Sequence, residues 1–437
     1  MVYSNKKKFL AINYKLNFMI KNYRGKKVAV VGLARSGLAA ARLLRDLGAE
    51  VFVTDSSSND KLRELAKDLI KDGMKVELGG HTIDFIRDKD LVVVSPGVSD
   101  KSQAIIWANE FKIPIISEIE LAWQNCSAKV IAVTGTNGKT TVTSLIAEVL
   151  KASGKRSYAL GNIGTPFSLE AGNLKHTDFV SLEVSSFQLE RIVKFKPQVA
   201  LILNLTPDHL DRYKDMSEYL SAKKRVFLNQ DQNDYLVLNY DDPALRALAK
   251  EARAKVIFFS SQDNPYNLNP NQLAVMAVAR ALGIAENICR EVFRNFKGVE
   301  HRLEQVRVLK DIEFINDSKA TNVDSAIWAL RNTRRQAIMI AGGRDKNSDY
   351  GVISDLIREK VKLLVVIGEA KEKIRSALGN VLPVKEASTL DEAVNLSYAQ
   401  AKGGDCVLFS PMCASFDMFE NYEHRGRVFK EIVNKLK

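Results

Sequence analysis

The stretch Val130–Thr141 reads VIAVTGTNGKTT, and its order of residue types predicts the fold around it. An apolar, β-branched run leads directly into a glycine-rich turn, and the helical stretch Val142–Leu150 follows. Strand, glycine turn and helix is what phosphate binding requires, because backbone N–H groups and the helix N-terminus then face the anion. The strict phosphate-loop pattern is not met, since Val133 stands where its first glycine belongs. The Gly138-Lys139-Thr140 core nevertheless favours a phosphate loop over an ordinary glycine-rich turn.

Short β-branched runs alternate with amphipathic stretches from Lys26 to the C-terminus, which predicts βαβ units on parallel sheets. A chain of 437 residues is long for one core. We expect an α/β protein with three domains: a Rossmann-like N-terminal domain (26–117), a central domain of the phosphate-loop ATPase type (118–299) and a Rossmann-like C-terminal domain (300–437). The predicted strands are 28–31, 51–54, 91–94, 113–116, 130–134, 179–183, 199–204, 314–316, 337–341, 363–367 and 406–410.

A second glycine turn, GLARSG at 32–37, opens the first of these domains. It has Ala34 where a dinucleotide fingerprint has its middle glycine, and Asp55 ends the next strand, where a carboxylate suits a ribose hydroxyl. From this motif alone, a nicotinamide-dependent oxidoreductase remains an alternative. A nucleotide-sugar diphosphate on the same turn also accounts for the loop at Lys139.

Three polar residues near predicted strand ends are candidate ligands. Glu183 ends the apolar run 179–182, where a carboxylate beside a phosphate loop holds the Mg²⁺ of a nucleotide. His209 lies in the polar loop 204–212, and Lys223 lies on a predicted helix at 217–228. By residue type alone, each also fits a simpler interpretation: a strand-end glutamate, a solvated loop histidine and a surface lysine.

The net charge of +12 is concentrated at the N-terminus. Residues 1–27 hold eight Lys and Arg residues and no acid, so the other 410 residues carry only +4. This distribution shows no basic stripe, and we expect no nucleic-acid partner. Residues 1–25 form a basic leader for which two interpretations stand: a disordered tail, or an upstream start codon with initiation at Met19.

Four cysteines without a C-x-x-C pair indicate a reducing compartment, with neither a disulfide framework nor a zinc site. No apolar run approaches the ~20 residues of a membrane helix. We therefore expect a cytoplasmic enzyme that acts on small molecules and has no membrane partner.

Eight motifs together resemble the Mur ligase family, from about Lys26 to the C-terminus. They are TGTNGKTT at 134–141, GNIG at 161–164, EVSSFQLE at 183–190, NLTPDHLDRY at 204–213, HR at 301–302, INDSKATN at 315–322, GGRDK at 342–346 and SPMCASFDMF at 410–419. The phosphate loop, Glu183 and His209 fit several amide ligases of this family, including folylpolyglutamate synthases. INDSKATN and SPMCASFDMF resemble the branch that adds D-glutamate, and Lys319 stands where other branches have a histidine-containing motif.

The resemblance implies an ATP-dependent ligase that joins D-glutamate to UDP-N-acetylmuramoyl-L-alanine through an acyl phosphate, acting as a monomer with two Mg²⁺. It implies UDP-substrate binding by Arg35, Ser36, Asp55, Ser56, Gly97 and Asn162. It implies ATP binding by Gly135, Thr136, Asn137, Gly138, Lys139, Thr140, Thr141, Asn271, Arg302, Asp317 and Lys319. It implies Mg²⁺ binding by Thr140, Glu183, His209 and a carbamylated Lys223, and D-glutamate binding by Thr321, Lys346, Ser415 and Tyr422. The catalytic residues would be Lys139, Lys223, His209 and Lys319.

The chain departs from the family pattern near adenine. The family has a His-Asn pair at the start of the last helix of the central domain, where this chain has Asn267 and Leu268, with Asn271 shortly after. The stretch 256–267 is also too short for the β-hairpins often found there, which predicts a shortened central domain.

Overall fold

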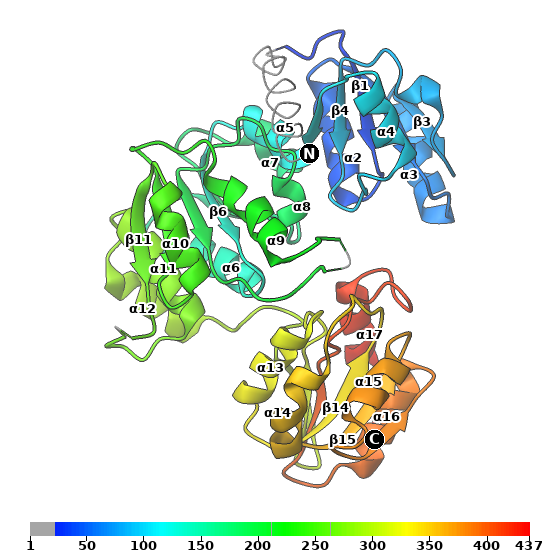
Figure 1. Ribbon diagram of the computed structural model, residues 1–437, viewed down its shortest axis with the longest axis vertical. Helices are drawn as coiled ribbons and strands as arrows, with labels where there is room; N and C mark the ends of the chain where they lie inside the picture. Colours follow the sequence, from blue (N-terminus) through cyan, green and yellow to red (C-terminus); the bar gives the residue numbers. More distant parts are fainter. Residues whose placement is uncertain (1–21, 211, 263) are drawn as a thin grey trace. The chain divides into compact units, whose positions relative to one another are not determined.

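The structure is a computed structural model that describes residues 22–210, 212–262 and 264–437. The predicted leader lies almost wholly outside the described residues. The chain forms two compact units, one running to Leu205 and resuming over Tyr219–Asn295, the other made of Thr206–Glu218 and Phe296–Lys437. The first unit contains two sheets and the second contains one (Figure 1), which confirms three parallel-sheet domains. The residue-level domain boundaries stay predictions.

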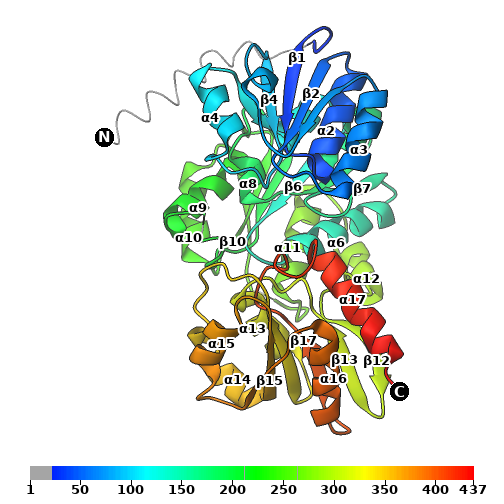
Figure 2. The same ribbon diagram turned by 90° about the vertical axis from the view of Figure 1, so that its right-hand side faces the viewer.

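The N-terminal sheet has the strand order β3-β2-β1-β4-β5, with every pair parallel. Its central strands are uninterrupted apolar runs, as expected where helices cover both faces. Helices α2 and α3 pack on one face and α4 on the other (Figure 2). The elements are β1 (Lys27–Val31), α2 (Arg35–Asp46), β2 (Glu50–Asp55), α3 (Asp60–Lys71), β3 (Lys75–Leu78), η1 (Ile83–Phe85), β4 (Leu91–Val94), α4 (Gln103–Glu110) and β5 (Ile115–Ser117).

The central sheet has the order β11-β10-β9-β6-β8-β7 and is also parallel throughout. The strand of the phosphate loop, β6, lies between β9 and β8, so the ends of all three strands are neighbours. The elements are α5 (Glu118–Gln124), β6 (Lys129–Thr134), α6 (Lys139–Ala152), β7 (Ser157–Gly161), α7 (Phe167–Glu170), η2 (Ala171–Asn173), β8 (Phe179–Glu183), α8 (Ser186–Leu189), β9 (Val199–Ile202), α9 (Met216–Lys223), η3 (Lys224–Phe227), β10 (Tyr235–Asn239), α10 (Pro243–Ala247), η4 (Leu248–Glu251), β11 (Lys255–Phe259), α11 (Pro270–Ala281) and α12 (Glu286–Asn295).

The third sheet has the order β12-β13-β17-β14-β15-β16, and only its edge strand β12 runs antiparallel. Successive residues of β14 and β17 alternate between two apolar clusters, one under α13, α14 and α15 and the other under α16 and α17 (Figure 2). The elements are β12 (Glu304–Leu309), β13 (Ile312–Asn316), α13 (Val323–Asn332), β14 (Ala337–Gly342), η5 (Gly351–Ile353), α14 (Ser354–Lys360), β15 (Val361–Ile367), α15 (Lys371–Leu378), β16 (Val384–Glu386), α16 (Leu390–Gln400), β17 (Cys406–Phe409) and α17 (Tyr422–Lys435).

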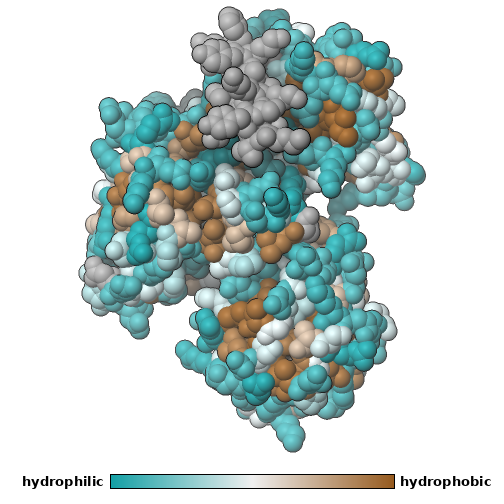
Figure 3. All heavy atoms as spheres, in the orientation of Figure 1, coloured by the Kyte–Doolittle hydropathy of each residue, from teal (hydrophilic) through white to brown (hydrophobic). Residues whose placement is uncertain are grey.

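The outer surface is mainly polar in the view of Figure 3, with hydrophobic side chains gathered in smaller areas between hydrophilic ones. No helix in the described part of the chain is long and apolar enough to cross a membrane.

Candidate active site

The phosphate loop joins the end of β6 to the start of α6, as the sequence predicts. Gly138 is the residue before the first helical turn and has a φ of 82°, which an L side chain rarely adopts. Asn204, at the end of β9, accepts hydrogen bonds at its Oδ1 from the backbone N–H groups of Thr136 (3.0 Å) and Asn137 (2.8 Å). The loop is therefore held open by a side chain from the neighbouring strand, a role that the sequence analysis did not assign to Asn204.

Two lysines converge on one carbonyl oxygen of this loop. Lys139 Nζ donates to the Gly135 oxygen (3.0 Å) and to the Thr136 oxygen (2.7 Å). Lys223 Nζ, which is buried at the end of α9, donates to the same Gly135 oxygen at 2.7 Å. Two ammonium groups so close repel each other, and an anion between them lowers that energy. The geometry therefore suits a phosphate, or the conversion of one amine to an anion.

The oxygen atoms that a Mg²⁺ ion needs lie beside this loop. Within the described ranges, Thr140 Oγ1 and Glu183 Oε2 are buried and have no hydrogen-bond partner, and Thr141 Oγ1 shares this state. The other carboxylate oxygen of Glu183 accepts a hydrogen bond from Asn162 Nδ2 (2.8 Å). Buried oxygens without partners cost free energy unless a ligand satisfies them, and hard oxygen donors are what Mg²⁺ prefers. Thr140 and Glu183 therefore fit the predicted metal site.

Asn271 lies against the phosphate loop, on the first turn of α11. A side chain added at Gly138 would collide with Asn271 Oδ1, so the two residues are in close contact. The structure thus brings Asn271 to the loop, as the prediction of a nucleotide contact requires. Asn269 caps the same helix through a hydrogen bond from the Gln272 N–H (3.0 Å).

The first glycine turn is shaped by close backbone approach. A Cβ at Gly37 would fall on the carbonyl oxygen of Gly32, so this position admits only glycine. The Asp55 carboxylate accepts hydrogen bonds from the backbone N–H groups of Leu33 (2.6 Å) and Ser57 (2.8 Å). Asp55 therefore braces the turn from the next strand. Arg35 begins α2 and donates to the Gly164 oxygen at 3.4 Å.

Ser36 lies on the first turn of α2, and the three other predicted UDP-substrate residues follow strands and are exposed. Ser56 follows β2, and both it and Gly97, after β4, are exposed. Asn162, after β7, is also an exposed residue, although its side-chain amide donates a hydrogen bond to Glu183. All of them follow carboxyl ends of parallel strands, where ligands of such sheets bind.

In the second compact unit, the predicted nucleotide residues cluster after β13. Asp317 is buried and accepts hydrogen bonds from Ser410 Oγ (2.8 Å) and the Leu303 N–H (3.2 Å). Burial raises the pKa of Asp317 to about 7, opposed by the nearby charge of Arg302. Lys319 Nζ donates to Tyr422 Oη at 2.6 Å, so the structure brings together one residue predicted for ATP and one predicted for D-glutamate.

The predicted D-glutamate residues follow three neighbouring strands of this sheet. Thr321 comes after β13, Lys346 after β14, Ser415 after β17, and Tyr422 begins α17. Ser415 is buried, whereas Thr321, Lys346 and Tyr422 are partly exposed. The carboxyl ends of these neighbouring parallel strands share one edge of the sheet, which is where ligands of such sheets usually bind. That the four residues bind D-glutamate stays a prediction.

The segment Thr206–Glu218, which carries His209, belongs to this second unit. Asp208 pairs with Lys346 Nζ (3.2 Å) and accepts a hydrogen bond from Asn322 Nδ2 (3.0 Å). His209 has a φ of 56° and lies with its Nε2 3.6 Å from Asp208. Lys223 belongs to the first unit, so a metal site shared by His209 and Lys223 stays a prediction. The sequence analysis gave no role to Asp208 or Asn322.

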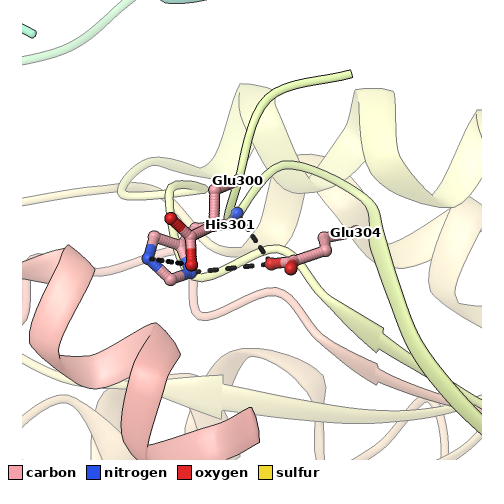
Figure 4. Close-up of side chains that lie close together, drawn as sticks. All are labelled: Glu300, His301 and Glu304. Carbon is pink, nitrogen blue, oxygen red and sulfur yellow. Dashed lines mark hydrogen bonds and ion pairs between the residues drawn. The ribbon is translucent and has the colours of Figure 1, made fainter. Parts of the chain in front are cut away.

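One group of three metal-type side chains occurs among the described residues: Glu300, His301 and Glu304 (Figure 4). Lys430 Nζ already bridges the two carboxylates, at 3.0 Å from Glu300 and 2.6 Å from Glu304. The Nδ1 atom of His301 lies 2.9 Å from Asn316 Nδ2. Burial lowers the pKa of His301, which favours the neutral imidazole. The group is a structural ion-pair cluster with its own cation.

Three family models match the chain in succession. They are described as the Mur ligase MurD-like N-terminal domain (residues 26–117), the Mur ligase middle domain (133–285) and the Mur ligase glutamate ligase domain (301–413). The chain therefore belongs to the Mur ligase family, whose members depend on ATP.

Curated relatives match over nearly their whole length. UDP-N-acetylmuramoylalanine–D-glutamate ligases of Koribacter versatilis and Chloroherpeton thalassium are 43% and 40% identical, over 94% of this chain and 98% and 99% of theirs. Among solved structures, UDP-N-acetylmuramate-alanine ligase of Thermotoga maritima covers 94% of this chain and 100% of its own, with a TM-score of 0.64 at 22% identity. The MurF ligase of the same organism gives 0.61 at 16%, covering 88% of this chain and 95% of its own. These structural likenesses support the fold.

Proposed function

We propose that this chain is the ATP-dependent ligase that joins D-glutamate to UDP-N-acetylmuramoyl-L-alanine in peptidoglycan precursor synthesis. The observation that supports ATP dependence is the phosphate loop between β6 and α6, which carries Lys139. Beside this loop, Thr140 and Glu183 each have a buried oxygen with no hydrogen-bond partner among the described residues. The relatives at about 40% identity carry the choice of substrates. We further propose that the enzyme works as a cytoplasmic monomer.

The chemistry requires activation because a carboxylate has a poor leaving group. ATP phosphorylates the L-alanyl carboxylate to an acyl phosphate, the amine of D-glutamate attacks, and the tetrahedral intermediate collapses to amide and inorganic phosphate. Phosphoryl transfer between anions is limited by charge and alignment, so positioned cations supply most of the catalysis. Lys139 would neutralise charge on the outer phosphates of ATP. Lys319, which belongs to the third domain, would neutralise charge on the transferred phosphoryl group.

The metal ligands would be Thr140 and Glu183 for one Mg²⁺, and His209 with a carbamylated Lys223 for a second. When bound, Mg²⁺ neutralises and orients phosphate oxygens. Carbamylation of Lys223 would replace one of two converging ammonium groups by an anion and would leave one N–H on Nζ, the atom that lies 2.7 Å from the Gly135 oxygen. Arg302, Asp317 and Asn271 would complete the nucleotide site.

The amino-acid site would lie at the edge of the third sheet, with Lys346 as its carboxylate partner. Lys346 already pairs with a carboxylate, that of Asp208, at 3.2 Å with both side chains mostly buried. The site therefore accommodates an acidic group at this cation, and D-glutamate would exchange with Asp208. Thr321, Ser415 and Tyr422 would supply hydroxyl donors to the remaining carboxylate oxygens.

The test is phosphate release from ATP with UDP-N-acetylmuramoyl-L-alanine and a panel of amino acids. We expect D-glutamate to be used, with L-glutamate, D-glutamine, L-lysine and meso-diaminopimelate at least ~100-fold poorer in kcat/KM, roughly 2.7 kcal/mol in the transition state. Preference for L-lysine or diaminopimelate would place the chain in another branch of the family. Amino-acid-independent ATP hydrolysis would favour a phosphate-loop switch protein, and NAD reduction would favour an oxidoreductase.

A further inference from the structure

Three loops of the third domain emerge side by side from its sheet. Strands β13, β17 and β14 are neighbours and run parallel, so their carboxyl ends share one edge. The loop after β13 carries Lys319, the loop after β17 carries Ser415, and the loop after β14 carries Lys346. The affinity for any ligand that contacts two of these loops depends on the distance between the loops.

A buried arginine joins two of these loops through hydrogen bonds. Arg425, on the first turns of α17, is 1% exposed. Its Nε and Nη2 donate to Ser318 Oγ (3.1 Å) and to the Ser318 oxygen (2.7 Å). Its Nη1 donates to the carbonyl oxygens of Cys413 (3.1 Å) and Ala414 (3.2 Å). One rigid guanidinium therefore fixes the residue before Lys319 and the two residues before Ser415.

All four described hydrogen bonds of Arg425 end on neutral oxygens. Burying a guanidinium costs free energy unless hydrogen bonds or opposite charges compensate it, and the nearby carboxylates of Asp417 and Asp317 favour its charged form. Burial lowers the pKa of Arg425 to about 10, so the group is still charged at neutral pH. The planar fork offers five donors in fixed directions, which no other side chain provides. The shape of the group, rather than helix packing alone, accounts for an arginine here.

Neighbouring contacts tie the same loops to α17 and to the third loop. Ser318 Oγ donates to the Tyr422 oxygen at 2.9 Å. Ala414 and Arg344 exchange two backbone hydrogen bonds, of 2.9 Å and 3.1 Å. A Cβ at Gly343 would fall on the Ala414 oxygen, so the loops touch closely. Arg425 stands at the point where these ties meet.

We infer that Arg425 is a positioning residue that sets the spacing between the Lys319 loop and the Ser415 loop, and thereby the affinity for the dicarboxylate amino acid. The inference rests on the proposed function, since the ligand of these loops is the proposed D-glutamate. Arg425 itself touches no substrate in this scheme. It acts through Ser318, Cys413 and Ala414.

The experiment compares R425M, R425K and R427M in the full-length enzyme. Arg427 is an exposed residue on the same helix, two positions away, and serves as the matched control. We expect R425M to raise the D-glutamate KM at least ~10-fold, because methionine fills the volume but donates nothing. R425K should be intermediate, since an ammonium reaches only one loop. R427M should stay within about twofold, and the UDP-substrate KM should stay within about twofold in all three.

Melting temperatures of the three variants separate positioning from packing. A D-glutamate KM that stays unchanged in R425M while its melting temperature falls would mean that Arg425 only holds the helix, and would overturn the inference. R425K kinetics equal to those of wild type would also overturn it, because the fork would not be needed. If R425M does not fold, R425K carries the test by the same criterion. Failure of the wild-type enzyme to use D-glutamate is a separate result and would refute the proposed function instead.

Discussion

Replacing Lys223 and Lys224 one at a time tests the metal-binding role that we propose for Lys223. The neighbours differ sharply in surroundings. Lys223 is 1% exposed and donates to the Gly135 oxygen of the phosphate loop at 2.7 Å. Lys224 pairs with Glu251 at 2.8 Å on the surface, with side chains 37% and 51% exposed. Helical neighbours point in different directions, so only one of the two faces the loop.

The expected effects follow from these contacts. An exposed ion pair contributes about 0.2–1 kcal/mol to stability, so K224A should leave kcat within about threefold of wild type. K223A would remove the anionic ligand that we propose for the second Mg²⁺, an electrostatic contribution of several kcal/mol, so kcat should fall at least ~100-fold. Because a truncated buried side chain also destabilises the fold, K223Q is the better-matched variant, and its melting temperature should be recorded with its kcat.

Two assays report on the carbamate itself. Removing CO₂ and bicarbonate should lower wild-type activity reversibly, and ¹³C-labelled bicarbonate should give a carbamate signal that K223Q lacks. A short carboxylic acid should restore part of the K223A activity, because it returns an anion to the space that the side chain leaves. The reasoning is refuted if K224A is the more damaging variant, or if K223Q keeps full activity with normal stability.

Two further perturbations probe the buried acid and the first turn. The pKa of Asp317 is raised to about 7 from an ordinary 3.8, so between these pH values the folded protein binds the proton and the unfolded chain does not. This contribution to stability is therefore complete at low pH and falls as the pH rises. In urea unfolding, the wild type should lose roughly 2–3 kcal/mol of stability relative to D317N from pH 5 to 7. A slope equal to that of D317N would show that Asp317 titrates normally. G37A should raise the UDP-substrate KM at least ~10-fold, because the added carbon falls on the Gly32 oxygen. G172A is the control and should match wild type, since its added carbon would lie 3.8 Å from Leu43. Equal KM values in the two variants would contradict a tight turn at the UDP site.

Local patterns in the sequence were sufficient for the elements that form from consecutive residues. The phosphate loop is one example: apolar run, glycines and helix are adjacent along the chain, and the structure places them as β6, loop and α6. The same is true of the glycine turn before α2. Short edge strands such as β3 and β16 were not predicted, because they are half-exposed and carry no long apolar run. β10 and β11 were also missed, and they pair in parallel rather than as a hairpin.

Contacts between distant residues were beyond the reach of local patterns. Asn204 lies 67 positions from the loop N–H of Asn137 that it binds, and Asp208 lies 138 positions from Lys346. Nothing in residue type distinguishes these polar side chains from solvated ones, since their partners are chosen by strand order. The resemblance to a family supplied roles for residues that touch ligands. It supplied none for Asn204, Asp208 or Arg425.

The bracing residues share a physical feature that makes them recognisable once the sheet order is known. Asn204 and Arg425 each use more than one atom of a single side chain on main-chain groups of loops that follow other strands. Asp55 uses one carboxylate oxygen on the turn after β1 and the other on the turn after its own strand. Such multiple bonding restricts the loop more than one contact does, because the side chain fixes direction as well as distance. Loops held in this way are preorganised for anionic ligands, and the free energy of ordering them is met during folding rather than at binding. The loops that carry the proposed substrate-binding residues are therefore held in part by side chains of other elements, such as Asn204 and Arg425, for which the sequence predicted no role.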